Sequence, residues 1–193
     1  VSDWKSVSKA FYEASPRVDG KIVPILWGTD AVHGHNNVIG ATIFPHNIGL
    51  GSTRNGDLIR KIGDVVAKEL LSTGIIWTFA PTIAVPQNDL WGRTYEGYSE
   101  DSELVSVFGE AMILGLQGTS TEFLDENHVL ATAKHFLGDG GTKNGVDQGN
   151  AIISEQGLKD IHGLPYYKAI DACVQSVMAS FNSWNGEKMH GNK

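Results

Sequence analysis

The chain has 193 residues, of which 41% are hydrophobic and 19% are charged, and its formal net charge is −7. This composition is typical of a globular protein, and the length predicts about one domain. The sequence contains no block of basic residues, which argues against nucleic-acid binding through a basic patch. Its apolar runs are shorter than the roughly 18 residues that a membrane span needs.

The single cysteine, Cys173, excludes an internal disulfide and a metal site made of several thiolates. We expect Cys173 to be buried as a small residue of an apolar helix. The chain starts at Val1 and ends at Lys193 without an obvious terminal element, and no signal peptide is visible. We therefore interpret both ends as truncations of a longer protein.

The predicted elements alternate between helices and strands along the chain. A helix is expected over residues 3–15 at the N-terminus. Four short apolar runs then predict strands. They cover residues 22–29, 75–81, 129–136 and 176–182.

Three further helices are predicted between and after these strands. Apolar side chains share one face of the first (Leu58, Ile62, Val65, Val66, Leu70) and of the second (Leu104, Val107, Phe108, Ala111, Leu114). Ser99 is the expected N-cap of the second helix, and Gly118 is expected just past its C-terminus. The third covers residues 154–172, and we expect Gly163 and Pro165 to break it into two pieces.

This alternation predicts βαβ units and a mainly parallel α/β sheet. The sequence holds about four such units, whereas a closed (β/α)8 barrel takes about 250 residues. We therefore expect residues 1–193 to form a partial (β/α)8 TIM-type barrel, made of about the first four βα units and a leading helix.

Charged residues follow the expected strands, at the end where such barrels place their active sites. Asp30 ends the first strand and is suited to accept hydrogen bonds from sugar hydroxyls, although a cap or salt-bridge role is the alternative. Arg93 offers a planar fork of donors to vicinal hydroxyls, and an ion pair with Glu96 or Asp101 is its alternative and compatible role.

Lys134 and His135 are adjacent on the third strand, and their side chains point to opposite faces in ideal geometry. Both can face one site only if the strand ends or twists there, and the following Gly-Asp-Gly-Gly makes this plausible. Because burying such a pair in an apolar strand is costly, we favour a functional role for both.

His33 and His35 have a spacing that suits a divalent metal, with His46 or Asp139 as loose candidates for further ligands. Loop histidines that simply make hydrogen bonds are the alternative. The loops 36–50 and 86–100 are rich in Asn, Gly, Trp and Tyr, which fits a carbohydrate site or ordinary turns equally well. No nucleophile elbow, phosphate loop or Cys-x-x-Cys motif is present.

Several sequence strings resemble the glycoside hydrolases of family 3, the β-glucosidases and exo-glucanases. The resemblance runs from about Ile22 onward and is carried most specifically by three strings. These are G-T-D-A-V-H-G-H (Gly28 to His35), W-G-R-T-Y-E (Trp91 to Glu96) and A-K-H-F-L-G-D-G (Ala133 to Gly140). Further matching strings are F-P-H-N-I-G-L-G (Phe44 to Gly51), F-A-P (Phe79 to Pro81) and V-M-A-S-F-N-S-W-N-G (Val177 to Gly186).

The resemblance implies a (β/α)8-type first domain followed by an α/β sandwich domain, and hydrolysis of terminal β-glucosyl residues with retention. It also implies that six residues hold or border the non-reducing sugar: Asp30, Arg93, Lys134, His135, Met178 and Phe181. Some plant relatives carry Tyr at the position of Phe181 and Glu at that of Gln148, so we expect the hydrogen bonding of the pocket to differ from theirs. No cofactor is implied.

Retaining hydrolysis needs a nucleophile and an acid/base about 5–5.5 Å apart. The family's nucleophile is an Asp in a string like G-F-x-x-S-D-W, which we expect beyond Lys193, with the acid/base farther on. Val1-Ser2-Asp3-Trp4 resembles that string, but no strand precedes it, so we interpret Asp3 as a helical residue. The isolated chain is therefore expected to bind glucose or a β-glucoside without turning it over.

Two alternatives stay open at the sequence level: a metal-dependent barrel hydrolase using His33, His35 and Lys134, and a non-catalytic sugar-binding module. A half barrel leaves a sheet edge and apolar strand faces uncovered. We therefore expect self-association or pairing with the remainder of the protein. A secreted or periplasmic location is expected rather than a cytoplasmic one.

Overall fold

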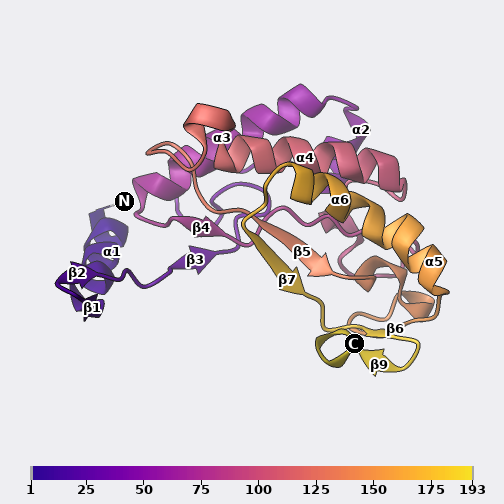
Figure 1. Ribbon diagram of the computed structural model, residues 1–193. Coiled ribbons are helices and arrows are strands. Elements are labelled where there is room, and N and C mark those ends of the chain that lie inside the picture. The colour runs from indigo at the N-terminus through magenta and orange to yellow at the C-terminus, as the bar shows by residue number, and fades with distance from the viewer. Residues whose placement is uncertain (1, 193) are drawn as a thin grey trace.

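The computed structural model describes residues 2–192 and shows a curved parallel sheet with helices on one side (Figure 1). Four strands form this sheet in the order β3, β4, β5, β7. They are β3 (Gly28–Thr29), β4 (Trp77–Thr78), β5 (Thr132–Phe136) and β7 (Ser176–Ala179). The pairs β3–β4 and β5–β7 are parallel, and backbone hydrogen bonds from Thr78 to Leu130 and from Ile83 to Lys134 join them.

All four expected strands are present, but the ladders are shorter than the apolar runs that predicted them. Residues 2–192 do not close the sheet into a barrel, and their four strands follow one another in chain order like consecutive units of a (β/α)8 barrel. The partial-barrel prediction is therefore confirmed.

The helices α3 (Gly56–Ser72), α4 (Ser102–Gln117) and α6 (Leu164–Asp171) lie side by side above the sheet in Figure 1. Their apolar stripes bury Ile59, Leu70, Phe108, Ile113 and Ala169 against the sheet. A short helix, α2 (Asn47–Ser52), precedes α3. The helix stripes and the sheet face beneath them make one core, whereas Phe136 and Val177 on the strands stay exposed.

The N-cap expected for α4 was wrong by two residues. Asp101, not Ser99, accepts hydrogen bonds from the backbone N–H groups of Glu103 and Leu104. The Ser99 hydroxyl instead accepts from the N–H group of Asp101 and supports the cap. The helix ends at Gly118 with φ +74°, as predicted for a glycine at that place.

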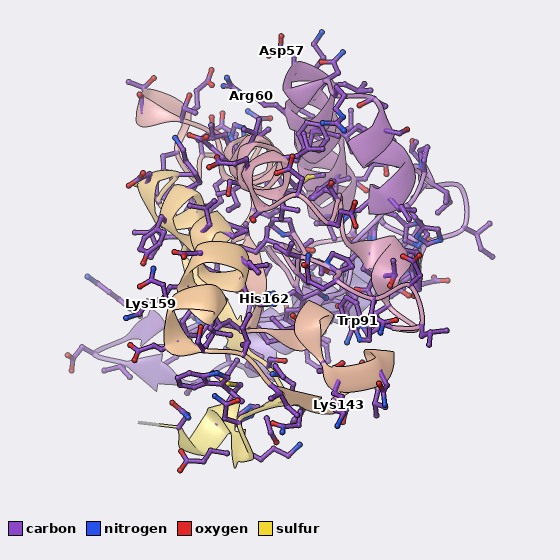
Figure 2. The ribbon with its side chains drawn as sticks, turned by 90° about the vertical axis from the view of Figure 1, so that its right-hand side faces the viewer. Asp57, Arg60, Trp91, Lys143, Lys159 and His162 are labelled. Atoms are coloured by element: carbon purple, nitrogen blue, oxygen red, sulfur yellow. The ribbon has the colours of Figure 1, made fainter. Side chains whose placement is uncertain are left out.

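The break expected at Gly163 and Pro165 is also wrong, because the helical run continues through them. It consists of α5 (Glu155–Gly157), a π-helical turn (Leu158–Gly163) and α6. The wider turn accommodates Pro165 at the start of α6, where a missing N–H group costs least. Figure 2 shows Lys159 on the outer side of this run and His162 on the side facing the turn that carries Lys143.

Smaller elements lie at the two ends of the sheet. At one end, α1 (Ser2–Ala14) confirms the predicted N-terminal helix and buries none of its residues. It is followed by a hairpin of β1 (Arg17–Val18) and β2 (Lys21–Ile22), and the other end carries β6 (Asn150–Ala151), β8 (Ser183–Trp184) and β9 (Glu187–Lys188). Asp3 lies exposed in the first turn of α1, as expected for a helical residue.

Cys173 is exposed, so its predicted burial is wrong. Helix α6 ends at Asp171, and Cys173 follows it with φ +59°. There the N–H group of Val174 turns back to the carbonyl of Ala169 and closes the helix end. In residues 2–192 no helix combines the length and apolarity needed to cross a membrane.

Candidate active site

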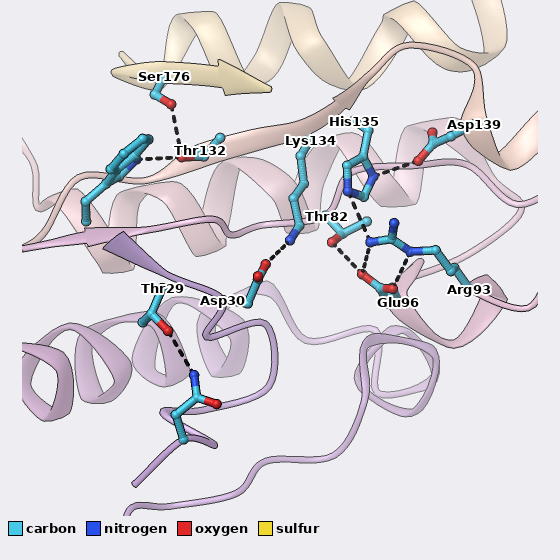
Figure 3. Close-up of polar contacts among 12 residues, drawn as sticks. Thr29, Asp30, Thr82, Arg93, Glu96, Thr132, Lys134, His135, Asp139 and Ser176 are labelled. Atoms are coloured by element: carbon cyan, nitrogen blue, oxygen red, sulfur yellow. Dashed lines mark hydrogen bonds and ion pairs between the residues drawn. The ribbon is translucent and has the colours of Figure 1, made fainter. Parts of the chain in front are cut away.

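The predicted polar residues meet at the carboxyl end of the sheet, where loops leave the strands (Figure 3). Asp30 directly follows β3, and Lys134 and His135 lie in β5. Arg93 and Glu96 belong to the loop after β4, which makes a 3₁₀ turn at Thr94–Glu96. Parallel strands end at the same edge, which is why residues 104 positions apart, such as Asp30 and Lys134, come into contact.

The first contact is an ion pair between a buried cation and an exposed anion. Lys134 Nζ donates to Asp30 Oδ1 at 2.6 Å. The Lys134 side chain is 3% exposed and that of Asp30 63% exposed. Asp30 thus neutralises the buried ammonium group while its carboxylate stays open to a ligand on the strand-end side.

Lys134 and His135 both face this end of the sheet, because β5 is irregular between Lys134 and Phe136. The register against β7 shifts there, so Lys134 pairs with Met178 and Phe136 with Ala179. A register shift of this kind re-aims a side chain. It confirms the expectation that the two neighbours share a site only where the strand is distorted.

The second ion pair has the opposite arrangement of burial. Arg93 Nε donates to Glu96 Oε1 at 2.6 Å and Arg93 Nη2 to Glu96 Oε2 at 2.9 Å. The Arg93 side chain is 34% exposed and that of Glu96 8% exposed. Thr82 Oγ1 adds a hydrogen bond to Glu96 Oε2 at 3.3 Å. The predicted alternative for Arg93, an ion pair with Glu96, is therefore present.

Electrostatics keep both partners of this pair charged. Burial alone raises the pKa of Glu96, but the hydrogen bonds and charge of Arg93, with the charge of Lys134, outweigh it and lower that pKa. The hydrogen bond to Glu96 raises the pKa of Arg93. The guanidinium is thus held in place by a bidentate carboxylate, the geometry that fixes its plane most firmly.

His135 links Arg93 to a third carboxylate. Arg93 Nη2 lies 3.1 Å from His135 Nε2, and His135 Nδ1 lies 2.8 Å from Asp139 Oδ2. The second oxygen of Asp139, Oδ1, is buried without a hydrogen-bond partner among residues 2–192. Asp139 was expected only as a loose metal ligand, and the structure places it instead at the end of this chain of contacts.

A second buried histidine lies beneath the same turn. The ring of His162 occupies the space that a side chain on Gly141 would need, so a glycine is required there. Burial lowers the pKa of His162, and the charge of Asp139 opposes this shift. The ring is therefore kept neutral next to a carboxylate that already serves His135.

The structure brings Met178 close to this site and leaves Phe181 farther out. Met178 lies half-buried in β7 opposite Lys134. Phe181 follows β7, is 66% exposed and stacks on His190 at 5.1 Å between ring centroids. Gln148 is exposed with φ +58° in the loop before β6.

The histidines proposed as metal ligands do not converge. His35 is buried, and its Nε2 lies 2.9 Å from Thr73 Oγ1. His33 instead packs its ring against His46, with centroids 4.3 Å apart, and His46 contacts Tyr95. Within residues 2–192 no three His, Cys, Asp or Glu side chains are grouped to hold a metal ion. The contacts assign these rings to packing and hydrogen bonding.

Sequence reasoning gave Glu96 a minor role and did not anticipate Thr82 or the Asp139 contact. The Glu96 pairing has a local signal, since three residues separate Arg93 from Glu96 and a 3₁₀ turn brings such residues together. Asp139 lies four residues after His135 across a glycine turn, a weaker signal because Gly138 takes φ +91°. Thr82 has no local signal, because only the strand pairing places it there.

The arrangement is suited to binding hydroxyl groups. Asp30 presents acceptors and Arg93 presents donors on the same side of the sheet, and both are oriented by buried partners. Each of the carboxylates Asp30, Glu96 and Asp139 contacts Lys134, Arg93 or His135.

Comparison with known proteins identifies the chain's relatives. The model of the glycosyl hydrolase family 3 N-terminal domain matches residues 1–193. A β-xylosidase of Formosa agariphila is 36% identical over 176 residues, covering 88% of this chain and 24% of the relative. A periplasmic β-glucosidase of Salmonella typhimurium is 35% identical (85% and 20%), and a lysosomal β-glucosidase of Dictyostelium discoideum 34% (87% and 21%). The chain thus spans about a quarter or less of these proteins.

Solved structures agree in fold over nearly the whole chain. An exo-1,3/1,4-β-glucanase of a Pseudoalteromonas species is 55% identical with a TM-score of 0.95, covering 99% of this chain and 24% of that protein. A mutant β-glucosidase of Listeria innocua in complex with laminaribiose is 27% identical with a TM-score of 0.84, covering 99% and 25%. With a family model matching over its full length, the chain belongs to glycosyl hydrolase family 3.

Proposed function

We propose that this chain supplies the sugar-binding part of an enzyme that removes terminal non-reducing β-D-glucosyl residues from β-glucosides or β-glucans. The observation that carries the proposal is the presence of two ion pairs at the strand ends, Lys134–Asp30 and Arg93–Glu96. The anion is the exposed partner in the first and the cation is the more exposed partner in the second. One leaves a carboxylate open and the other a guanidinium. A sugar hydroxyl both donates and accepts hydrogen bonds, so it can use both groups at once.

In this proposal Asp30 accepts hydrogen bonds from hydroxyls of the non-reducing sugar, and Arg93 donates to them. Lys134 adds a further polar contact and His135 acts through Arg93, while Met178 and Phe181 border the pocket. Charge-assisted hydrogen bonds of this kind favour one sugar orientation and strengthen when charge develops in the transition state.

The chemical step proposed is a two-step displacement with retention of configuration. We place its nucleophile and acid/base outside residues 1–193, as the resemblance to family 3 implies. No cofactor is required for such a step. The isolated chain is therefore proposed to bind sugar without measurable turnover.

We also propose that further parts of the same protein cover both ends of the sheet. Apolar grooves of about 540 Å³ lie at each end. One is lined by Phe11, Trp27 and Ile76, and the other by Phe136, Tyr166 and Trp184. Exposed apolar grooves beside open strands favour association. The isolated chain should accordingly self-associate in sedimentation velocity, and a single monomeric species would contradict this.

A secreted or periplasmic location is part of the proposal. The relatives include a β-glucosidase named as periplasmic and one named as lysosomal, which supports a location outside the cytosol. Fractionation of the source cells with an antibody to the chain tests this directly.

The deciding experiment measures hydrolysis by the full-length protein that carries this chain, with aryl β-glucoside and aryl β-xyloside compared. We expect kcat/KM for the glucoside to exceed that for the xyloside, and Asp30→Ala or Arg93→Ala to lower it by about 100-fold or more, since each removes a charged hydrogen-bonding group. Asp64→Asn is the matched control, because this carboxylate pairs with Lys68 on the outer side of α3 and not with the site.

Several outcomes would contradict the proposal. Equal or faster xyloside hydrolysis would replace glucose by xylose as the preferred sugar. Turnover by the isolated 193-residue chain that is abolished by Asp30→Ala or Asp3→Ala would place the catalytic group inside it. Full activity of Asp30→Ala in the whole protein would remove the binding role.

A further inference from the structure

Donor and acceptor chemistry fixes the protonation pattern of His135. The Arg93 side chain has five N–H groups and no acceptor. At the 3.1 Å contact, Arg93 Nη2 must therefore donate, and His135 Nε2 must accept with a lone pair. The ring proton then resides on Nδ1, which donates to Asp139 Oδ2 at 2.8 Å.

Asp139 is the group that enforces this tautomer. An ionised carboxylate can only accept hydrogen bonds, so it is compatible with Nδ1–H and not with an Nδ1 lone pair. Both side chains are nearly inaccessible, 11% exposed for His135 and 8% for Asp139, so water is a poor substitute partner. Were the proton on Nε2, it would point at an Arg93 donor and leave both contacts unfavourable.

The Nδ1–H tautomer gives Arg93 a third acceptor. Its Nε–H group binds Glu96 Oε1, and the two hydrogens on Nη2 bind Glu96 Oε2 and His135 Nε2. Within residues 2–192, only the two hydrogens on Nη1 have no protein acceptor. The guanidinium is thus held at three points, with one amino group left for a ligand.

We propose that Asp139 is a positioning residue that sets the His135 tautomer, and through it orients the Arg93 guanidinium so that Nη1 meets a sugar hydroxyl. Asp139 itself need not touch the sugar. The identity of the ligand rests on the proposed function, whereas the tautomer assignment rests on contacts within the chain alone.

The first test is nuclear magnetic resonance of the full-length protein, 15N-labelled at histidine, with the His135 signals assigned by their loss in His135→Gln. We expect the unliganded protein to show the Nδ1–H tautomer. In Asp139→Asn the Nε2–H form should gain population, because an amide can donate to Nδ1. A wild-type ring protonated at Nε2 overturns the proposal without any variant.

Asp125→Asn is the matched control. It alters another His–Asp contact among residues 2–192, where His128 Nδ1 lies 2.7 Å from Asp125 Oδ1 outside the site. We expect it to leave the His135 spectrum and sugar affinity unchanged. An equal change of His135 in both variants would mean that the tautomer follows general stability, which contradicts the proposal.

The second test measures KM and kcat for a series of monodeoxy β-glucosides. Asp139→Asn should lower kcat/KM for the parent glucoside by about 10- to 100-fold, as expected for a weakened charged hydrogen bond. The loss should shrink for the one deoxy sugar that lacks the hydroxyl met by Arg93. A loss that is equal for every deoxy sugar contradicts positioning through Arg93.

These two tests separate the inference from the function on which it rests. A protein that shows the Nδ1–H tautomer but hydrolyses no glucoside contradicts the proposed function and supports the tautomer assignment. A protein that hydrolyses the glucoside but shows the Nε2–H tautomer supports the proposed function and contradicts the tautomer assignment. If Asp139→Asn fails to fold, the wild-type spectrum and the Arg93→Lys variant on the same deoxy series decide the question.

Discussion

The two ion pairs at the strand ends are built with opposite polarity. In Lys134–Asp30 the cation is buried and the carboxylate is open, whereas in Arg93–Glu96 the carboxylate is buried and the guanidinium is more open. In each pair the buried side chain, Lys134 or Glu96, orients its more exposed partner. On the proposed function, a site for a neutral, hydroxyl-rich ligand is assembled from charged groups whose net charge nearly cancels.

The pairs also differ in how firmly they are held. Lys134 makes one hydrogen bond to Asp30, so rotation of the exposed carboxylate costs little. Arg93 is fixed by two contacts to Glu96 and one to His135. We expect the Asp30 side to adapt to a ligand and the Arg93 side to select it.

The largest expected effect is an asymmetry within the first pair. Asp30→Asn leaves the buried Lys134 ammonium without a charged partner and should lower the free energy of unfolding by about 2–3 kcal/mol. Lys134→Met leaves an exposed carboxylate that water solvates and should cost about 1 kcal/mol or less. Urea denaturation of both variants measures the difference, and equal losses would show that Lys134 is hydrated.

The second pair should give a smaller effect that depends on pH. Glu96→Gln keeps one acceptor oxygen and should cost about 1–2 kcal/mol near neutral pH. Because the folded-state pKa of Glu96 is lowered, its stabilisation is complete above the usual value of 4.5 and is lost as the pH falls through the folded-state pKa. Below pH 4.5 the free energy of unfolding should therefore fall less steeply with decreasing pH in Glu96→Gln than in the wild type. An unchanged slope would mean that the Arg93–Glu96 pair does not contribute to acid unfolding.

Arg93→Lys tests whether the fork or only the charge matters. Lysine keeps the charge but cannot bridge both Glu96 oxygens and His135. We expect KM for the glucoside to rise about 10-fold, with about 1 kcal/mol of stability lost. Steady-state kinetics and urea denaturation of the full-length protein measure both. Unchanged KM would reduce Arg93 to a point charge.

The smallest expected effect is at His162, whose neighbourhood disfavours charge. Its folded-state pKa is lowered by burial, so stability is unaffected above the usual value of 6.5 and falls as the pH drops below it. The slope contributed by one proton is at most about 1.4 kcal/mol per pH unit. His162→Gln should flatten the profile just below pH 6.5, and an identical profile in the variant would contradict this assignment.

The sequence predicted the sheet, its parallel order and the residues at its carboxyl end, because strand ends and motif residues coincide along the chain. It predicted a distortion of the strand at Lys134 and His135 but not the register shift that makes it, since register depends on the pairing with β7. It located the cap of α4 only to within two residues because Ser99 and Asp101 are both good caps. Cys173 was misplaced because the end of α6 depends on a local backbone turn rather than on apolarity.

Within the site, the role of each side chain was harder to predict than its presence. The positions of Arg93, Lys134 and His135 at one end of the sheet were predicted, while Asp139, expected as a loose metal ligand, contacts His135 instead. Its partner is chosen by the glycine turn at Gly138, which folds the chain back on His135. Backbone conformations at positive φ carry little sequence signal beyond the glycine itself.

The π-helical turn at Leu158–Gly163 has a consequence for how this helix tolerates changes in length. Such a turn takes up one residue more than an α-helical turn, so the segment acts as a single-residue insertion in an otherwise ordinary helix. Deleting one residue there would rewind the segment and rotate the preceding side chains by about 100° relative to α6. The number of residues in this turn therefore decides which side chain faces Gly141. A deletion of one residue in the turn would move His162 away from that position.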